Sequence, residues 1–467
     1  MTPPPPAPDS FGTLPLSAAA QENLQRLGYL QMTAIQAASL PPALQGRDVI
    51  AQAKTGSGKT AAFALALLAR LDARRFDVQA LVLCPTRELA DQVAIEIRRL
   101  ARAEDNVKVV TLAGGVPLRG QVTSLERGAH VAVGTPGRVL DHLDRGTLVL
   151  DALATLVLDE ADRMLDMGFV DDIASVARRC PPQRQTLLFS ATYPEGIASI
   201  ARQFMRDPVT VKVEAQHGTG QIEQRWYEVR EGERLAAVGR LLEHFRPAST
   251  LAFCNTKARC RELAALLQAQ GYSALALHGD LEQRDRDQVL VRFANGSCSV
   301  LVATDVAARG LDVAGLACVI NVDIPPDPEA HVHRIGRTGR AGQAGLALSL
   351  ATLDEMGAVG RIEQLQGRPS VWHALTGLTP APGGRLLPPM ATLHIQGGRK
   401  EKIRPGDVLG ALTADLGYTR EQVGKIDINE FATYVAVDRA IAHEAAARLN
   451  SGRIKGRAVK ARLLGDT

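Results

Sequence analysis

The segment AKTGSGKT, residues 53–60, contains the residue types that bind the phosphates of a nucleotide. Its glycines let backbone N–H groups surround an anion, and the N-terminus of the apolar helix expected after it favours negative charge. Lys59 can reach the β- and γ-phosphates, and the Thr60 hydroxyl can ligate Mg²⁺. A flexible turn without a ligand is the alternative, but the apolar strand before the segment favours the phosphate site. The expected nucleotide-binding residues are Thr55, Gly56, Ser57, Gly58, Lys59 and Thr60.

Two acidic residues follow another apolar run later in the chain. In TLVLDEADRMLD, Asp159 and Glu160 come directly at the end of an expected strand. Such acids are more often helix N-caps than catalytic groups when they stand alone. Together with a phosphate-binding loop they predict nucleotide hydrolysis, in which Asp159 holds Mg²⁺ and Glu160 orients and deprotonates the attacking water.

A third motif, HRIGRTGR at residues 333–340, presents three arginines separated by glycine turns. The string alone is also typical of a solvated basic loop. Phosphoryl transfer needs cations at the γ-phosphate, however, and an arginine finger raises the rate by roughly 10³ to 10⁵. Arginines from a second domain would complete the site only when two domains close. We therefore expect hydrolysis to be coupled to domain closure.

Alternating apolar runs and helical segments predict the sheets that position these motifs. Between residues 48 and 192, runs such as ALVLCPT and TLVLDEAD are separated by segments such as ELADQVAIEIRRLAR, which is apolar on one helical face. The same pattern returns between residues 225 and 350. Strands that alternate with helices predict parallel α/β domains, whose ligands bind at the carboxyl ends of the strands. In this chain, clusters of polar residues follow the apolar runs at the carboxyl ends of the expected strands.

Changes in composition divide the chain into three folded parts. The hinge between the first two is expected near two glycines, Gly218 and Gly220, and the clearest linker is LTGLTPAPGGRLLPPMA. The expected boundaries are a Pro-rich arm at 1–10, a first α/β domain at 11–208, a hinge at 209–224, a second α/β domain at 225–368, a linker at 369–390 and a small domain at 391–467.

The composition excludes several classes of protein. The 467 residues are 46% hydrophobic and 22% charged, which is typical of globular domains rather than disordered or fibrous chains. No apolar stretch approaches the roughly 20 residues that cross a bilayer, and the first residues, MTPPPPAPDS, do not resemble a signal peptide. Six scattered cysteines without a C-x-x-C pair indicate reduced, buried thiols. We therefore expect a cytoplasmic protein.

In this order the motifs resemble those of the DEAD-box RNA helicases, and the letters DEAD stand at residues 159–162. The resemblance covers residues 11–350 and implies two RecA-like domains of the P-loop NTPase type, helicase superfamily 2, with ATP and Mg²⁺ as cofactors. It implies that Arg337 and Arg340 are the arginine fingers and that Asp312 lies near the ribose of ATP. The residues that it implies for adenine are Phe11, Thr33 and Gln36, although Met32 replaces the proline that is usual in the family.

The same resemblance implies contacts with the backbone of an RNA strand. SAT, residues 190–192, resembles the element that links ATP hydrolysis to strand separation. Contacts with phosphate and sugar position a strand without reading its sequence, so this part of the chain does not select a particular RNA. The implied RNA-binding residues are Pro85, Thr86, Arg87, Gly115, Thr135, Arg138, Thr304 and Arg309.

Residues 391–467 are the basic part of the chain, with 13 Lys and Arg residues and 9 Asp and Glu residues, and they supply the whole net charge of +4. Their pattern predicts the order β, α, β, β, α, β of a ferredoxin-like, RNA-recognition-motif domain. The aromatic platform of that motif is mostly missing, since His394 stands on the first strand and only Tyr434 occupies a stacking position. A protein-binding domain is the alternative. The candidate RNA-binding residues are Arg399, Lys400, Lys402, Arg404, Tyr434, Arg453, Lys455, Lys460 and Arg462.

The string GGRKEKIRPGDVLGALT, with VGKIDI, YVAV, AIAH and GRIKGR after it, resembles the C-terminal domain of one bacterial DEAD-box subfamily. That resemblance implies a hairpin of 23S rRNA near the peptidyl-transferase centre as the partner, and a role in assembly of the large ribosomal subunit. A general helicase of mRNA decay or cold adaptation, and an ATP-gated RNA clamp with little unwinding, are the alternatives. Neither DNA nor a membrane is expected as a partner.

Overall fold

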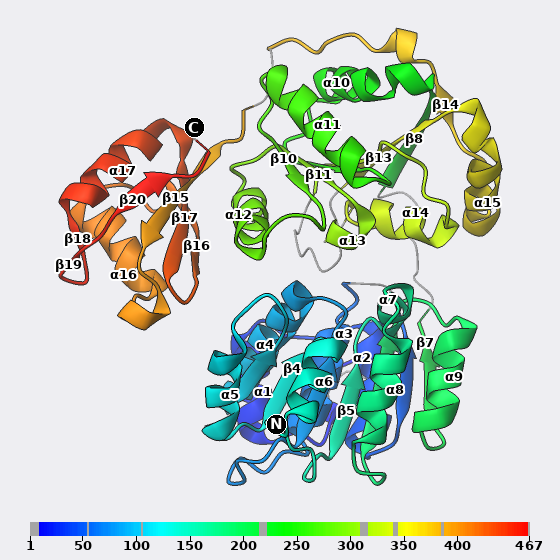
Figure 1. The fold of residues 1–467 in the computed structure, drawn as a ribbon, viewed down its shortest axis with the longest axis vertical. Helices are drawn as coiled ribbons and strands as arrows, with labels where there is room; N and C mark the ends of the chain where they lie inside the picture. Colours follow the sequence, from blue (N-terminus) through cyan, green and yellow to red (C-terminus); the bar gives the residue numbers. More distant parts are fainter. Residues whose placement is uncertain are drawn as a thin grey trace, which may run out of the picture. The chain divides into compact units, whose positions relative to one another are not determined.

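The computed structural model describes residues 9–53, 56–103, 106–213, 222–308, 316–339, 344–383 and 387–465. The chain forms two compact units, residues 1–216 and 217–467. Figure 1 shows a sheet covered by helices in the first unit, and a similar sheet and a smaller one in the second. The expected fold class, two RecA-like parallel-sheet domains and a small α+β domain, is confirmed. Within the described ranges, no helix is both long and apolar enough to span a bilayer.

The first unit is built on seven parallel strands in the order β3-β4-β2-β5-β6-β1-β7. Its central strands are covered on both faces, which explains why the run ALVL is apolar at every position rather than at alternate positions. Alternate residues of the strands enter two apolar clusters, one on each face. The strands are β1 (Val49–Gln52), β2 (Ala80–Leu83), β3 (Val109–Leu112), β4 (Val131–Gly134), β5 (Thr155–Leu158), β6 (Gln185–Ser190) and β7 (Val209–Lys212).

Helices connect these strands and cover both faces of the sheet (Figure 1). Several begin at residues with the chemistry of an N-cap. Thr86 accepts a hydrogen bond from the N–H of Leu89, and Pro136 occupies the first turn of the helix that follows Thr135. The helices are α1 (Ala18–Arg26), α2 (Ala34–Leu44), α3 (Lys59–Leu68), α4 (Arg87–Leu100), α5 (Leu118–Glu126), α6 (Pro136–Asp144), α7 (Ala161–Asp166), α8 (Val170–Arg178) and α9 (Glu195–Phe204).

The second unit begins with another sheet of seven parallel strands, in the order β10-β11-β9-β12-β13-β8-β14. Its strands are β8 (Ile222–Glu228), β9 (Thr250–Phe253), β10 (Ala274–Leu277), β11 (Val300–Ala303), β12 (Cys318–Asn321), β13 (Gly345–Ala351) and β14 (Trp372–His373). Its helices are α10 (Arg234–Phe245), α11 (Lys257–Ala269), α12 (Gln283–Ala294), α13 (Asp305–Ala308), α14 (Pro328–Ile335) and α15 (Met356–Gln366).

Two expected boundaries differ from the structure. Residues 209–212, assigned to the hinge, form β7, which pairs with β1 at the edge of the first sheet. Residues 372–373, assigned to the linker, form β14, which pairs with β8. The segment after β14 is held against α10, because Arg240 donates a hydrogen bond to the carbonyl of Leu375 at 2.6 Å. Both segments are short and gain their structure only from strands or helices far away in the chain.

The C-terminal part of the second unit has the expected order β, α, β, β, α, β. Its antiparallel sheet has the order β16-β17-β15-β20, and one face packs on two helices to form a separate apolar core. A short hairpin, β18 and β19, is inserted before the last strand. The elements are β15 (Met390–Gln396), α16 (Pro405–Gly410), β16 (Val423–Ile428), β17 (Ala432–Asp438), α17 (Ala442–Ser451), β18 (Arg453–Ile454), β19 (Arg457–Ala458) and β20 (Ala461–Leu463).

All six cysteines are buried and free. Burial raises the pKa of Cys180 to about 11 and that of Cys298 to about 12, and it raises the pKa of Cys84 beside the acids Asp159 and Glu160 as well. These thiols therefore act as small apolar side chains of the core, as the sequence predicts.

Candidate nucleotide and RNA sites

The order of the strands divides the carboxyl edge of the first sheet into two halves. The phosphate loop follows β1, the acids follow β5 and SAT begins in β6, and these three strands are neighbours in the order β5-β6-β1. The residues expected to contact RNA follow β2, β3 and β4, which are neighbours in the order β3-β4-β2. Because β2 pairs with β5, the two groups of motifs adjoin at the centre of the sheet. One half of this edge, here called the nucleotide half, thus carries the residues expected to bind the nucleotide, and the other, the RNA half, carries those expected to bind RNA.

The end of the phosphate loop is fixed by a buried glutamine. Gln36 accepts a hydrogen bond from the N–H of Thr33 at 2.8 Å and donates one to the carbonyl of Gly58 at 3.1 Å. Gly58 has φ +94°, and a Cβ there would lie 2.5 Å from Nε2 of Gln36, so the position requires glycine. Lys59 is buried and donates to the carbonyl of Ala53 at 2.9 Å. Thr55 lies outside the described residues.

The aromatic residue expected near adenine has a different environment. Phe11 is only 4% exposed, and its ring meets that of Tyr29 edge to face, with centroids 6.2 Å apart. The structure therefore gives Phe11 a packing role in the core of the first unit. Met32, in place of the usual proline, is also buried, and its N–H donates to the carbonyl of Asp9 at 2.7 Å. The turn before Thr33 is thus closed without proline.

The two acids lie at the end of β5 on the nucleotide half. Asp159 is buried, and burial raises its pKa to about 7 while Lys59 opposes that rise. Its carboxylate accepts a hydrogen bond from the N–H of Glu160 at 3.0 Å. Glu160 adopts a left-handed backbone conformation, with φ +49°, at the start of α7, a strained geometry of the kind found at functional sites.

These donors fit Mg²⁺. The Thr60 hydroxyl and the carboxylate of Asp159 are hard oxygen ligands of the type that Mg²⁺ prefers, and a cation would stabilise the buried carboxylate in its charged form. In the described part of the chain, no group of three or more His, Cys, Asp or Glu side chains is arranged to hold a metal by itself. This agrees with the usual binding of Mg²⁺ through one or two protein oxygens together with the phosphates of a nucleotide.

Asp162 connects the acidic motif to SAT, a link that the sequence analysis did not assign. Its carboxylate accepts hydrogen bonds from the N–H of Ala191 at 3.2 Å and from the N–H and hydroxyl of Thr192 at 2.9 and 3.2 Å. Its own N–H donates to the Ser190 hydroxyl at 3.2 Å. These hydrogen bonds lower the pKa of Asp162 against the effect of burial. The side chain therefore joins the end of β6 to α7.

The RNA half is organised around Arg138 and Gln121. Arg138 donates to the carbonyl of Val116 at 3.2 Å and to Oε1 of Gln121 at 3.1 Å, and Gln121 donates to the carbonyl of Ala113 at 2.9 Å. These bonds hold the turn that contains Gly115, which is exposed. Sequence reasoning missed Gln121, because its burial and its bonds with Ala113 and Arg138 are visible only in the structure. The other RNA-binding candidates here, Pro85, Thr86, Arg87 and Thr135, directly follow β2 and β4.

In the second unit the first arginine of HRIGRTGR is structural. Arg334 is buried, pairs with both carboxylate oxygens of Asp305 at 2.6 and 2.7 Å, and donates to Oδ1 of Asn255 at 2.8 Å. It thereby joins α14 to the segments that follow β9 and β11. Arg337 lies just beyond α14 and is partly exposed. Thr304 is buried at the end of β11. Arg309, Asp312 and Arg340 lie outside the described residues.

Part of the open face of the small sheet, around Thr392 and Tyr434, is covered by the α/β domain of the same unit. The side chain of Thr392 on β15 is buried and hydrogen-bonded to the Ser297 hydroxyl at 2.6 Å. Tyr434, beside His394 on this face, is 5% exposed. Burial raises the pKa of Tyr434, and Asp287 of α12 raises it further while Arg284 of the same helix opposes the rise. A ring so covered has no open face for a base. Stacking by Tyr434 therefore does not fit this structure.

Arg462 pairs with His394 across β15 and β20 and so lies on the same sheet face as Tyr434. The other basic candidates of the small domain also face solvent, and most of them lie in its loops. The N–H groups of Arg399 and Lys400 donate to carbonyls of the turn between β16 and β17, and Nζ of Lys455 donates to the carbonyl of Lys402 at 2.9 Å. The loop after β15, this turn and the β18–β19 hairpin thus form one surface. The exposed candidates are Arg399, Lys400, Lys402, Arg404, Arg453, Lys455, Lys460 and Arg462, and Arg457 of the hairpin is exposed as well.

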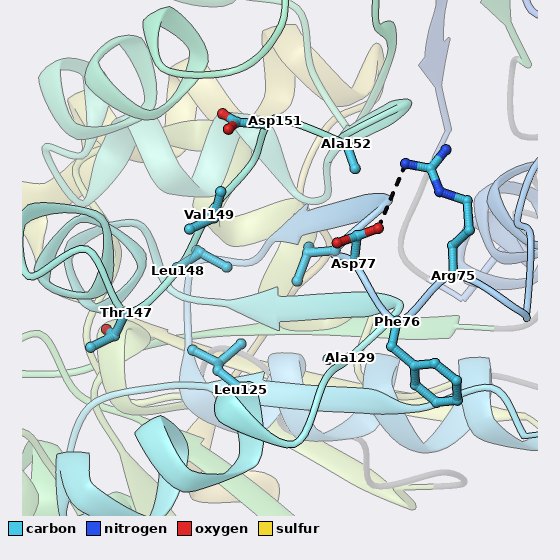
Figure 2. Close-up of a pocket in the computed structure, with 11 residues that line it drawn as sticks. Arg75, Phe76, Asp77, Leu125, Ala129, Thr147, Leu148, Val149, Asp151 and Ala152 are labelled. Atoms are coloured by element: carbon cyan, nitrogen blue, oxygen red, sulfur yellow. Dashed lines mark ion pairs between the residues drawn. The ribbon is translucent and has the colours of Figure 1, made fainter.

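A cavity of about 410 Å³ lies away from these motifs (Figure 2). It is lined by residues that precede β2, β4 and β5, such as Val78, Ala129 and Ala152, and hence lies at the edge of the sheet opposite the nucleotide half. Figure 2 shows Arg75 and Asp77 joined by an ion pair there, at 3.6 Å. None of the predicted site residues lines this cavity.

Comparison with known proteins agrees with this division of the chain. Residues 33–200 match the DEAD/DEAH box helicase family, residues 233–342 the helicase conserved C-terminal domain, and residues 392–463 the DbpA RNA binding domain. The chain is 54% identical over 459 residues to the ATP-dependent RNA helicase DbpA of Escherichia coli. This alignment covers 97% of this chain and 99% of that protein. The chain belongs to the DEAD-box ATP-dependent RNA helicases.

Other DEAD-box helicases match the core alone. CshA of Geobacillus kaustophilus is 47% identical over 360 residues, which is 77% of each chain. Among solved structures, Dbp5 of Saccharomyces cerevisiae bound to RNA and ADP BeF3 has a TM-score of 0.72 and 30% identity, covering 79% of this chain and 96% of that one. The C-terminal domain thus distinguishes this DEAD-box helicase from relatives that share its core, and it resembles that of DbpA.

Proposed function

We propose that this DEAD-box helicase is directed by its C-terminal domain to 23S rRNA near the peptidyl-transferase centre, and that it acts there in assembly of the large ribosomal subunit. The observation that carries the proposal is the match of residues 392–463 to the DbpA RNA binding domain within an alignment that spans 97% of the chain. The exposed basic loop and hairpin of that domain support it, because neutralisation of phosphates is the usual source of affinity for nucleic acids.

In the helicase core we propose that Lys59 and Thr60 hold the phosphates of ATP, with Thr60 and Asp159 as the protein ligands of Mg²⁺. When bound, Mg²⁺ would neutralise charge that develops on the β- and γ-phosphates. Glu160 would orient the attacking water and accept its proton, and Gln36, held by its bonds with Thr33 and Gly58, would bind the edge of adenine with its remaining N–H and lone pair. Arg337 and Arg340 would supply positive charge to the γ-phosphate, as arginine fingers do.

On the RNA half, Pro85, Thr86, Arg87, Gly115, Thr135 and Arg138 would bind the sugar–phosphate backbone, together with Thr304 and Arg309 of the second unit. Because Asp162 binds both Ala191 and Thr192, it would connect the nucleotide to the segment implied in strand separation. The core would thus open short duplexes wherever it is placed, and the C-terminal domain would determine the place.

The test compares RNA-stimulated ATP hydrolysis by the full-length protein with a 23S rRNA fragment that carries the hairpin and with an unrelated hairpin of equal length. We expect the rRNA fragment to stimulate at a much lower concentration. The double change Arg399→Gln/Arg404→Gln should reduce this advantage. It should also lower the slope of log affinity against log salt by about 1 for each phosphate that is no longer neutralised.

The matched control is Arg127→Gln/Arg178→Gln, which removes the same charge. These exposed arginines follow α5 and end α8, at the edge of the first sheet away from both halves of the site. The control should behave as the wild type does. Equal stimulation by both RNAs would refute the proposed targeting to 23S rRNA and favour a general helicase. ATP hydrolysis without separation of a short duplex would instead indicate an ATP-gated clamp.

A further inference from the structure

Phe431 is an exposed aromatic residue on the basic surface of the C-terminal domain. It lies in the turn between β16 and β17, and the residue is 60% exposed. Single exposed apolar residues are common on protein surfaces and need no explanation by themselves. The surroundings of Phe431 make this one different, because both its backbone and its charged neighbours are fixed by contacts with the loop after β15.

The turn that carries Phe431 is locked to that loop by three backbone hydrogen bonds. The N–H of Gly397 donates to the carbonyl of Phe431 at 3.0 Å, that of Arg399 to Asn429 at 2.9 Å and that of Lys400 to Glu430 at 3.0 Å. The approach is so close that a Cβ on Gly398 would lie 2.3 Å from the carbonyl oxygen of Asn429. The ring is thus presented on a rigid turn, which reduces the entropic cost of binding a ligand.

One face of the Phe431 ring is covered by a cation. Nζ of Lys400 lies 3.9 Å from the ring centroid, and the same ammonium pairs with Glu430 at 3.1 Å. Since the residue remains 60% exposed, the ring still offers area to a ligand. An aromatic face beside fixed positive charge is the combination that proteins use for unpaired nucleotides, with the base on the ring and the phosphates on the cations.

Further cations lie in the same loop and in the hairpin that is bound to it. Lys402 and Arg404 follow in the same loop, and Lys455 binds the carbonyl of Lys402 at 2.9 Å, which brings the β18–β19 hairpin to the loop. Arg457 of that hairpin helps to lower the pKa of Glu401. Since the sheet face with Tyr434 is covered, Phe431 is the one aromatic side chain that is mostly exposed in the described part of the C-terminal domain.

We propose that Phe431 stacks on an unpaired base of the bound RNA while Arg399 and Lys402 neutralise phosphates beside it. The proposal rests on the proposed function, because it assigns a base-binding position to the domain that is expected to bind rRNA. It moves the aromatic contact from the covered face of the sheet to the turn between β16 and β17. It also gives this contact to a residue outside the predicted set.

The test measures the dissociation constant of the full-length protein, without nucleotide, for the labelled 23S rRNA hairpin fragment and for a single-stranded oligouridine. Base–aromatic stacking is worth about 1–3 kcal/mol by alanine substitution, so Phe431→Ala should weaken binding by roughly 5- to 150-fold. Phe431→Leu should weaken it similarly, and Phe431→Trp should bind like the wild type. The salt slope should not change in Phe431→Ala, since the same phosphates remain neutralised.

The outcomes separate this inference from the 23S rRNA proposal. If Phe431→Ala weakens binding of both RNAs, stacking is supported, even when the wild type shows no preference for the rRNA hairpin. Such a lack of preference would refute only the proposed targeting to 23S rRNA. Unchanged binding of both RNAs by Phe431→Ala would overturn the inference without contradicting the proposed targeting to 23S rRNA. Wild-type affinity of Phe431→Leu would also overturn it, because that result would indicate apolar contact rather than stacking. Unchanged thermal unfolding should show that each variant is folded.

Discussion

Replacing Gly58 by alanine should impair nucleotide binding through a clash that the structure locates. A left-handed backbone costs a residue other than glycine about 1–2 kcal/mol. The new Cβ would also lie 2.5 Å from Nε2 of Gln36 and 3.0 Å from the Thr33 hydroxyl, so that Gln36 must move. Displacement breaks the two hydrogen bonds of Gln36, each worth about 0.5–1.5 kcal/mol. The backbone cost and the two lost hydrogen bonds together should destabilise the native phosphate loop by about 2–5 kcal/mol.

Gly146→Ala provides the matched control. Gly146 also has a positive φ, +66°, but a Cβ there would meet no atom within 4 Å, so only the backbone term of about 1–2 kcal/mol applies. We expect Gly58→Ala to weaken binding of fluorescent ADP at least tenfold and Gly146→Ala to leave it unchanged. In a protein that already carries Gln36→Ala, the change Gly58→Ala should weaken ADP binding less, because the Gln36 amide with which the new Cβ clashes is absent. Equal affinities of the two glycine variants, or strict additivity with Gln36→Ala, would refute this reasoning.

Asp162→Asn should impair duplex separation more than ATP hydrolysis, because an amide cannot accept every hydrogen bond that the carboxylate accepts from Ala191 and Thr192. Each of these charge-assisted hydrogen bonds is worth about 1.5–3 kcal/mol. Parallel assays of the two activities check this prediction, and equal losses of both would contradict it. His331 is buried against Trp226, and burial lowers its pKa to about 3. The unfolded chain therefore binds the proton first as the pH falls below about 6.5, and near pH 4.5 this should cost about 2–3 kcal/mol of stability. Thermal unfolding of His331→Gln should lose that part of the acid sensitivity, and identical pH profiles would argue against it.

Much of the core could be predicted because its information is local. A phosphate loop, an acidic pair after a strand and the alternation of strands and helices each occupy a few consecutive residues. Parallel topology then brings the carboxyl ends of the strands to one edge. The division of that edge into a nucleotide half and an RNA half depends on the spatial order of the strands, which no single motif contains.

The predictions that do not fit depend on contacts between distant parts of the chain. Spacing places Phe11 before the expected adenine motif, but only the contact with Tyr29 shows that the residue is buried. Alternation places Tyr434 correctly on the face of the sheet away from the helices, yet that face is buried by residues near Ser297, more than a hundred positions earlier. The short strand Val209–Lys212 has no strong pattern of its own and is ordered by pairing with β1.

The burial of all six cysteines makes the native protein suitable for site-specific labelling. A raised pKa keeps these thiols protonated near neutral pH, and burial shields them from reagents, so maleimide dyes should leave the wild type unmodified. One new cysteine in each unit, such as Glu126→Cys and Glu262→Cys at exposed helical positions, could then carry a donor and an acceptor dye. Single-molecule fluorescence would then test whether the two units close and open during each turnover, without first removing any native thiol.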